Sequence, residues 1–146
     1  MKNIKKIFFL VLFLLINTQK INAGINDALF MTIGNKPITQ SDIVDEIKII
    51  LILNNESYSD DKRDQLHELA VRSTVKRTIK KIELERNNFF QLNEEDLERE
   101  ITKLATNIFI DVDTLKNLCE SNELDFSKVE DRIKTELYWN SLIFEM

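Results

Sequence analysis

The side chains best suited to catalysis or metal binding are scarce in this chain. His67 is the only histidine and Cys119 the only cysteine among 146 residues. A single histidine excludes a metal site with two histidine ligands, and two glycines are too few for a glycine-rich phosphate loop. We interpret His67, in the charged segment DQLHELA, as a solvated helix position. The sequence therefore predicts no catalytic residue, no metal site and no cofactor.

Cys119 is predicted to be a core residue rather than a reactive thiol. It follows Val112, Leu115 and Leu118 at the spacing of an apolar helix stripe. Buried thiols of this kind are generally inert. A lone cysteine also cannot form a disulfide within the chain.

A basic run is the next candidate, and it consists of Lys76, Arg77, Lys80 and Lys81. It could be a nucleic-acid stripe, but the whole chain has a formal charge of −5, which becomes −9 if four N-terminal lysines are removed. Such acidity disfavours nucleic acid and anionic lipid as partners, because both attract clustered cations. We therefore favour ion pairs between this run and the acids of the third and fifth expected helices.

A surplus of large apolar side chains in the second half of the chain is the stronger indication of function. They exceed what one narrow stripe on each short helix can bury, so some could line a groove that receives apolar partner segments. The alternative for each of them is an ordinary core position. The residues predicted to bind peptide are Phe89, Phe90, Phe109, Ile110, Tyr138 and Trp139.

The elements that must position these residues are mainly helical. Glycine stands only at 24 and 34 and proline only at 37, so no residue type interrupts the backbone from 38 to 146. Before that, residues 28–33 favour a strand, Gly34 and Asn35 a tight turn, and residues 36–38 a short returning strand. The predicted fold is mainly α, with a small N-terminal β-hairpin followed by about five helices.

Capping residues and apolar spacing set the expected helices. Thr39 with Asp42, Asn93 with Asp96, Asp111, and Ser127 with Glu130 are the expected starts of four helices, and Asn87 with Asn88 is an expected stop. The expected helices cover about 40–53, 61–87, 94–108, 112–120 and 127–146. Their expected buried residues include Ile43, Val44, Ile47, Ile50 and Leu51 in the first, Leu66, Leu69, Ala70, Val75, Ile79 and Ile82 in the second, and Val129, Ile133, Leu137 and Phe144 in the fifth.

The N-terminus is typical of a cleavable secretion signal. Three lysines precede an unbroken apolar stretch at residues 7–16, about half the length that spans a bilayer. We expect residues 1–23 to be removed after Ala23, and residues 24–146 to form one periplasmic domain without stable membrane insertion. An uncleaved membrane anchor is the alternative.

Four segments carry a resemblance to a known family: INDALFMTIGNKPITQSDIVDEI, STVKRTIKKIELERNNF, LNEEDLEREI and DTLKNLCESNELDFSKVEDRIKTELYWNSL. In this order, across residues 25–144, they resemble the N-terminal domain of SurA-type periplasmic chaperones and their peptidyl-prolyl isomerase relatives. The resemblance implies a helical cradle that holds unfolded outer-membrane proteins. In that family, separate parvulin domains isomerise proline, and a C-terminal segment completes the core; neither part is found in this sequence.

The function expected from these patterns is that of a periplasmic holdase without enzymatic activity. Its partners would be unfolded or extended polypeptides, chiefly outer-membrane protein precursors, and not nucleic acid. Two alternatives stay open. The chain could be the N-terminal fragment of a parvulin-type isomerase whose catalytic domain is not in this chain, or it could be a helical module that docks on a folded protein.

Overall fold

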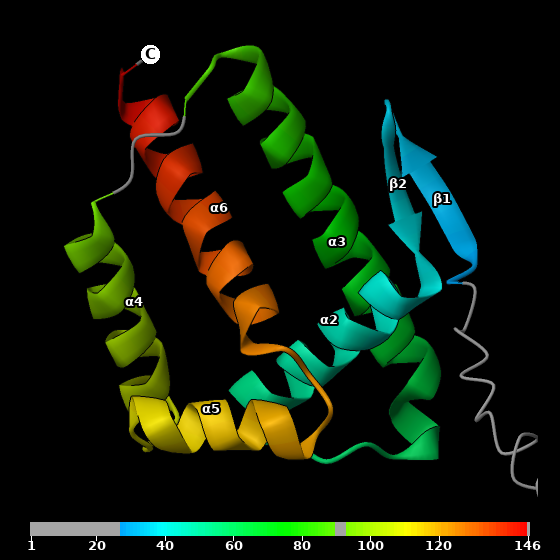
Figure 1. The fold of residues 1–146 in the computed structure, drawn as a ribbon. Coiled ribbons are helices and arrows are strands. Elements are labelled where there is room, and N and C mark those ends of the chain that lie inside the picture. The colour runs from blue at the N-terminus through cyan, green and yellow to red at the C-terminus, as the bar shows by residue number, and fades with distance from the viewer. Residues whose placement is uncertain (1–26, 90–92, 146) are drawn as a thin grey trace, which may run out of the picture.

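The computed structural model describes residues 27–89 and 93–145 of the chain. The predicted signal peptide, residues 1–23, and the predicted binding residue Phe90 lie outside the described residues. The described part confirms the mainly α fold with a small hairpin before five α-helices (Figure 1). The elements are β1 (Leu29–Ile33), β2 (Lys36–Thr39), α2 (Gln40–Leu53), the 3-10 helix η1 (Asp60–Lys62), α3 (Arg63–Arg86), α4 (Glu94–Asn107), α5 (Val112–Ser121) and α6 (Phe126–Glu145). The second expected helix, about 61–87, therefore begins as a 3-10 turn and becomes an α-helix at Arg63.

The hairpin leads directly into the first described helix. β1 pairs antiparallel with β2, and Gly34, at φ +57°, supplies the left-handed conformation that the two-residue turn requires. Thr39 then caps α2 as predicted. Its hydroxyl accepts the amide of Asp42, and the Asp42 carboxylate accepts the amide of Thr39 at 2.9 Å.

Four helices end in the same way, although none has glycine at its end. Asn55, Asn88, Phe109 and Glu123 take positive φ after α2, α3, α4 and α5. After α4, for example, the amide of Ile110 donates to the carbonyl of Ala105 at 3.1 Å, closing the last turn. The expected stop at Asn88 is confirmed. Of these four residues, Phe109 is the least favourable in the left-handed conformation, because its bulky side chain is strained there.

Three helices, α3, α4 and α6, form one layer with α6 in the middle. α6 packs against α3 on one side and against α4 on the other, and α5 crosses one end of this layer (Figure 1). The hairpin lies against α3, on the side away from α4. The layer therefore brings side chains of α3 and α6 together, and both helices contribute to the sites described below.

Two apolar clusters form the core, and α2 contributes to both. One cluster contains Ile38, Ile43 and Ala70 under the hairpin. The other lies between α2, α4, α5 and α6, and its buried members are Ile49, Ala105, Leu115, Cys119, Leu124 and Val129. Burial raises the pKa of the Cys119 thiol, as expected for an inert core position.

The expected buried faces of α2 and α3 were partly wrong. On α2 the buried residues are Ile43, Glu46 and Ile49, while Val44 is 50% exposed. On α3, Leu69 and Ile79 are exposed, although Leu66 and Ala70 are buried as predicted. The physical reason is that charged side chains occupy interior positions here, so the apolar spacing alone points to a slightly rotated face.

α6 begins earlier than predicted, and one of its residues that was expected to be buried is exposed. It starts at Phe126, because the Asp125 carboxylate accepts the amide of Ser127 at 2.9 Å and so takes the capping role predicted for Ser127. Near the other end, Leu142 is buried and Phe144 is 93% exposed. Val129 is buried as predicted.

Candidate functional site

The basic run of α3 divides between two sides of the helix. Arg77 and Lys81 line a charged cavity shared by β2, α2, α3 and α6. Lys76 and Lys80 line an apolar hollow shared by α3 and α6. The division follows from helical geometry, since residues four apart lie on the same side and adjacent residues do not.

The charged cavity centres on a buried carboxylate, that of Glu46, which is fully excluded from solvent. Arg132 of α6 donates to its Oε1 at 2.8 Å, and the Ser73 hydroxyl of α3 donates to the same atom at 2.6 Å. Arg77 Nη2 lies 2.7 Å from Oε2, an ion pair without the geometry of a hydrogen bond. One side chain of α2 is therefore held by two other helices.

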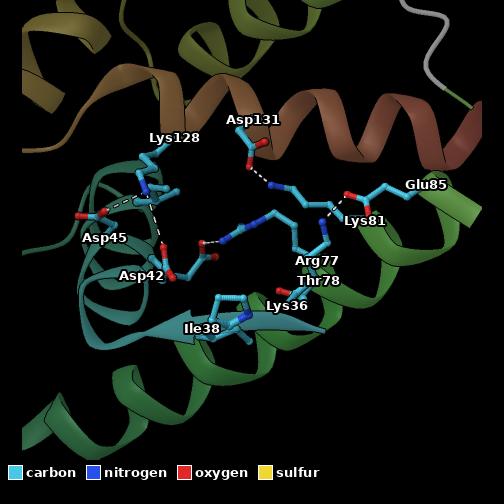
Figure 2. A pocket seen from close by; sticks show the side chains of 13 residues that line it. Lys36, Ile38, Asp42, Asp45, Arg77, Thr78, Lys81, Glu85, Lys128 and Asp131 are labelled. Atoms are coloured by element: carbon cyan, nitrogen blue, oxygen red, sulfur yellow. Dashed lines mark hydrogen bonds and ion pairs between the residues drawn. The ribbon is translucent and has the colours of Figure 1, made fainter. Parts of the chain in front are cut away.

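The remaining charges around this cavity of about 330 Å³ also neutralise one another (Figure 2). Lys81 Nζ lies 2.6 Å from Asp131 Oδ2, and Lys36 bonds Glu85 at 2.7 Å. Lys128 lies 3.7 Å from carboxylate oxygens of both Asp42 and Asp45. Each lining cation thus has an acidic partner, which points to a structural role rather than to ligand binding.

The predicted pairing of the basic run is correct in part. Lys81 pairs with Asp131 and Lys80 with Glu136, both on α6, the fifth expected helix. Arg77 pairs instead with Glu46 of α2. Among the described residues, no member of the run pairs with an acid of α4, because α6 lies between α3 and α4 (Figure 1).

The apolar hollow is the best candidate for a binding site. It has a volume of about 450 Å³, within the usual range of ligand pockets. Its apolar side chains are Val75 and Ile79 of α3 and Trp139 of α6, and Ile79 is 47% exposed. The ammonium of Lys80 lies 5.7 Å from the centre of the Trp139 ring, so a cation–π contact holds the indole against α3.

The structure does not bring the predicted peptide-binding residues into one patch. Phe89 follows α3 and Phe109 follows α4, and the C-terminal ends of these helices lie at opposite ends of the helix layer (Figure 1). Ile110 packs against the core cluster, while Phe109 is 96% exposed. Of the predicted set, Trp139 lines the apolar hollow.

Tyr138, although adjacent to Trp139 in sequence, belongs to a different hollow. That hollow, of about 250 Å³, also contains Leu84 and Thr135 and lies on the other side of the contact between α3 and α6. Sequence reasoning missed Val75 and Ile79 as site residues, because their helical spacing assigned them to the core. The charged side chains of Arg72 and Lys76 flank Val75 and Ile79 in the sequence, and they were the feature that could have indicated an exposed site.

The remaining chemical candidates give no second site. His67 is exposed, and its ring meets that of Phe30 edge-on at 5.7 Å. Within residues 27–89 and 93–145, histidine, cysteine and acidic side chains form no cluster suited to a metal ion. In the same part of the chain, no helix combines the length and the apolar character needed to cross a membrane.

Comparison with known proteins adds no relative to this picture. No protein-family model, curated protein or solved structure matches the chain. The resemblance to SurA-type chaperones stays a prediction from the sequence.

Proposed function

We propose that this chain is a periplasmic chaperone module that holds unfolded, exported polypeptides, with outer-membrane protein precursors as its main clients. The observation that carries the proposal is the apolar hollow formed by Val75, Ile79 and Trp139. It is open to solvent and lies on two packed helices, so it presents a preformed apolar surface to a partner. The sequence supplies the expectation of export, through the apolar stretch before Ala23.

The energetics of such a surface suit reversible holding. Burying one large apolar side chain of a client in the hollow contributes about 1.5–3 kcal/mol before the cost of ordering the client. Several contacts of this size give roughly micromolar affinity, about 8 kcal/mol. Weak binding is needed because the sequence has no glycine-rich loop for a nucleotide that could drive release.

Phe109 is a second contact in this proposal. Its exposed side chain directly follows the C-terminal end of α4. A client longer than the hollow could cover both positions, which adds affinity without a new pocket. Phe89, Phe90, Ile110 and Tyr138 stay as predictions of further contacts.

The test compares two exposed β-branched side chains on different helices. A fluorescein-labelled, aromatic-rich peptide is titrated with the protein, and anisotropy gives the Kd. Ile79→Ser should weaken binding by about fivefold or more, because it removes apolar contact area from the hollow. Val44→Ser, at a position that is 50% exposed on α2, should leave the Kd unchanged. Circular dichroism confirms that both variants are folded.

Absence of binding by the parent protein at about 100 μM would contradict the holdase proposal, since a micromolar site would then be nearly saturated. Export is tested separately. Protein released by osmotic shock should have the intact mass of a chain that starts at Gly24, whereas a full-length product found only in the membrane fraction would contradict export.

A further inference from the structure

The wall of the apolar hollow is cationic as well as apolar. Arg72, Lys76 and Lys80 line it at i, i+4 and i+8 along α3. Among the described residues, no acidic side chain lines the hollow. This is unexpected in a chain of formal charge −5, whose charged cavity is lined by paired charges of both signs.

The three cations differ in whether an acidic side chain already pairs with them. Lys80 is buried, bonds Glu136 and lies over the Trp139 ring, so it maintains the hollow itself. Arg72 pairs with Glu68 one turn away, and both side chains are more than 70% exposed, so the pair contributes little and can exchange partners. Lys76 is exposed, and no acid among the described residues pairs with it.

We infer that the hollow selects client segments in which an acidic residue stands two positions from a large apolar residue. This inference rests on the proposed function and names the clients that the site prefers. The apolar side chain enters between Ile79 and Trp139, and the carboxylate meets the ammonium of Lys76. An aspartate or glutamate thereby adds affinity, and a lysine at the same position opposes the existing cations.

The spacing follows from the geometry of the two chains. Lys80, which lies over the Trp139 ring, comes four residues after Lys76, so the apolar site and the Lys76 ammonium are about 6 Å apart along the axis of α3. In an extended peptide, side chains two apart point to the same side and are about 6.6–6.8 Å apart. An extended client lying along α3 therefore places an apolar side chain at Trp139 and a carboxylate at Lys76 when these two residues are i and i+2, whereas its residues i and i+1 point to opposite sides.

The experiment uses four labelled peptides built on one central phenylalanine: aspartate at both i−2 and i+2, asparagine at these positions, lysine at these positions, and aspartate at i−1 and i+1. Anisotropy titrations with the full chain give four Kd values. The first peptide should bind about two- to fivefold more tightly than the asparagine peptide, the range expected for exposed ion pairs. The lysine peptide should bind most weakly, and the i±1 peptide should resemble the asparagine peptide.

Two further measurements assign the preference to Lys76. Lys76→Gln should abolish the difference between the aspartate and asparagine peptides, while Lys103→Gln, at an exposed lysine of α4, should preserve it. At 1 M salt the difference should disappear in the parent protein, because the screening length falls to about 3 Å.

The outcomes separate this inference from the proposed function. Equal affinity for the aspartate and asparagine peptides overturns the inference and leaves the holdase function standing. Failure of all four peptides to bind overturns both. An aspartate preference that survives Lys76→Gln overturns the role of Lys76. Tighter binding to phosphatidylglycerol vesicles than to any peptide, lost in Lys76→Gln, would assign the cations to a lipid surface instead.

Discussion

Two regions on opposite sides of α3 use the same residue types in different ways. In the charged cavity, Arg77 Nη2 forms an ion pair with a fully buried carboxylate, while the Nη1 of the same side chain is buried without a hydrogen-bond partner among the described residues. In the apolar hollow, Lys76 stands exposed beside apolar side chains without an acidic partner among the described residues. One helix therefore carries both a structural ion network and a surface suited to a partner.

The difference lies in the position of the acids. α2 places Glu46 between Ile43 and Ile49, which belong to the two apolar clusters of the core. A buried charge is tolerated there because two arginines and a hydroxyl surround it. On the hollow side, α6 contributes Trp139 and a single acid, Glu136, which Lys80 takes. Basic side chains are therefore available for binding where the neighbouring side chains are apolar rather than acidic.

The largest effect is expected from removing the buried carboxylate. Glu46→Ala leaves Arg77 and Arg132 close together without their shared anion, so the free energy of unfolding should fall by about 3–5 kcal/mol. Glu85→Ala, which breaks an exposed pair with Lys36, should cost less than about 1 kcal/mol. Urea unfolding followed by circular dichroism measures both. Similar losses in the two variants would show that burial of the Glu46 carboxylate makes no energetic difference.

A smaller effect is expected when the whole network is replaced by apolar side chains. In the triple variant Glu46→Leu, Arg77→Met, Arg132→Met, no uncompensated charge is left, so most of the loss seen in Glu46→Ala should be recovered. The same urea unfolding experiment checks this. If the triple variant is as unstable as Glu46→Ala, the network contributes net stability rather than merely satisfying a buried acid.

The sequence predicted the elements better than it predicted the faces they bury. Thr39, Asn88, Asn93 and Asp111 act locally on the backbone of their own turn, so the hairpin and the helix boundaries followed from residue type. Two helices begin elsewhere than predicted. α3 begins at Arg63, after a 3-10 turn at Asp60–Lys62, and α6 begins at Phe126, because Asp125 replaces Ser127 as the capping residue.

Burial depends on partners distant in sequence, and there the predictions were weaker. Glu46 is buried because Arg132, 86 positions later, reaches it, and no local pattern carries that information. Ile79 fits an apolar stripe, yet it is exposed and lines the hollow, and no local pattern predicts this either. Of the predicted binding residues, Trp139 lines the hollow. The aromatic residues in the sequence could not identify it among the others, because the fold decides where α6 meets α3.

A third variant tests whether an exposed apolar side chain outside the hollow contributes to peptide binding. Phe109→Gly relieves a left-handed conformation that costs a bulky residue about 1–2 kcal/mol, although glycine loses more entropy on folding. The free energy of unfolding should therefore rise by up to about 1 kcal/mol. Peptide affinity should fall by less than in Ile79→Ser. A larger loss of affinity at Phe109 than at Ile79 would move the main site to the end of α4.

The smallest effect concerns acid at the helix starts, outside both regions. Hydrogen bonds from the amide and side chain of Thr114 hold the pKa of Asp111 below its ordinary range, and those of Ser127 act likewise on the pKa of Asp125. A lowered folded-state pKa means that this stabilisation is present above about pH 4 and is lost as the pH falls further. In Asp111→Asn with Asp125→Asn, stability between pH 4 and about 2 should depend less on pH. If the free energy of unfolding, measured with urea, depends on pH as strongly in this variant as in the parent, these two groups do not cause the loss of stability in acid.

The most direct test of the account is the fluorescence of Trp139, the only tryptophan in the chain. If clients enter the hollow, titration with an unlabelled aromatic-rich peptide should shift the emission to shorter wavelength, because the indole loses water. The shift should saturate with the same micromolar Kd that anisotropy gives, and Ile79→Ser should weaken both signals together. Binding seen by anisotropy while Trp139 emission stays constant up to about 100 μM peptide would contradict the account, since the hollow would then be empty in the complex.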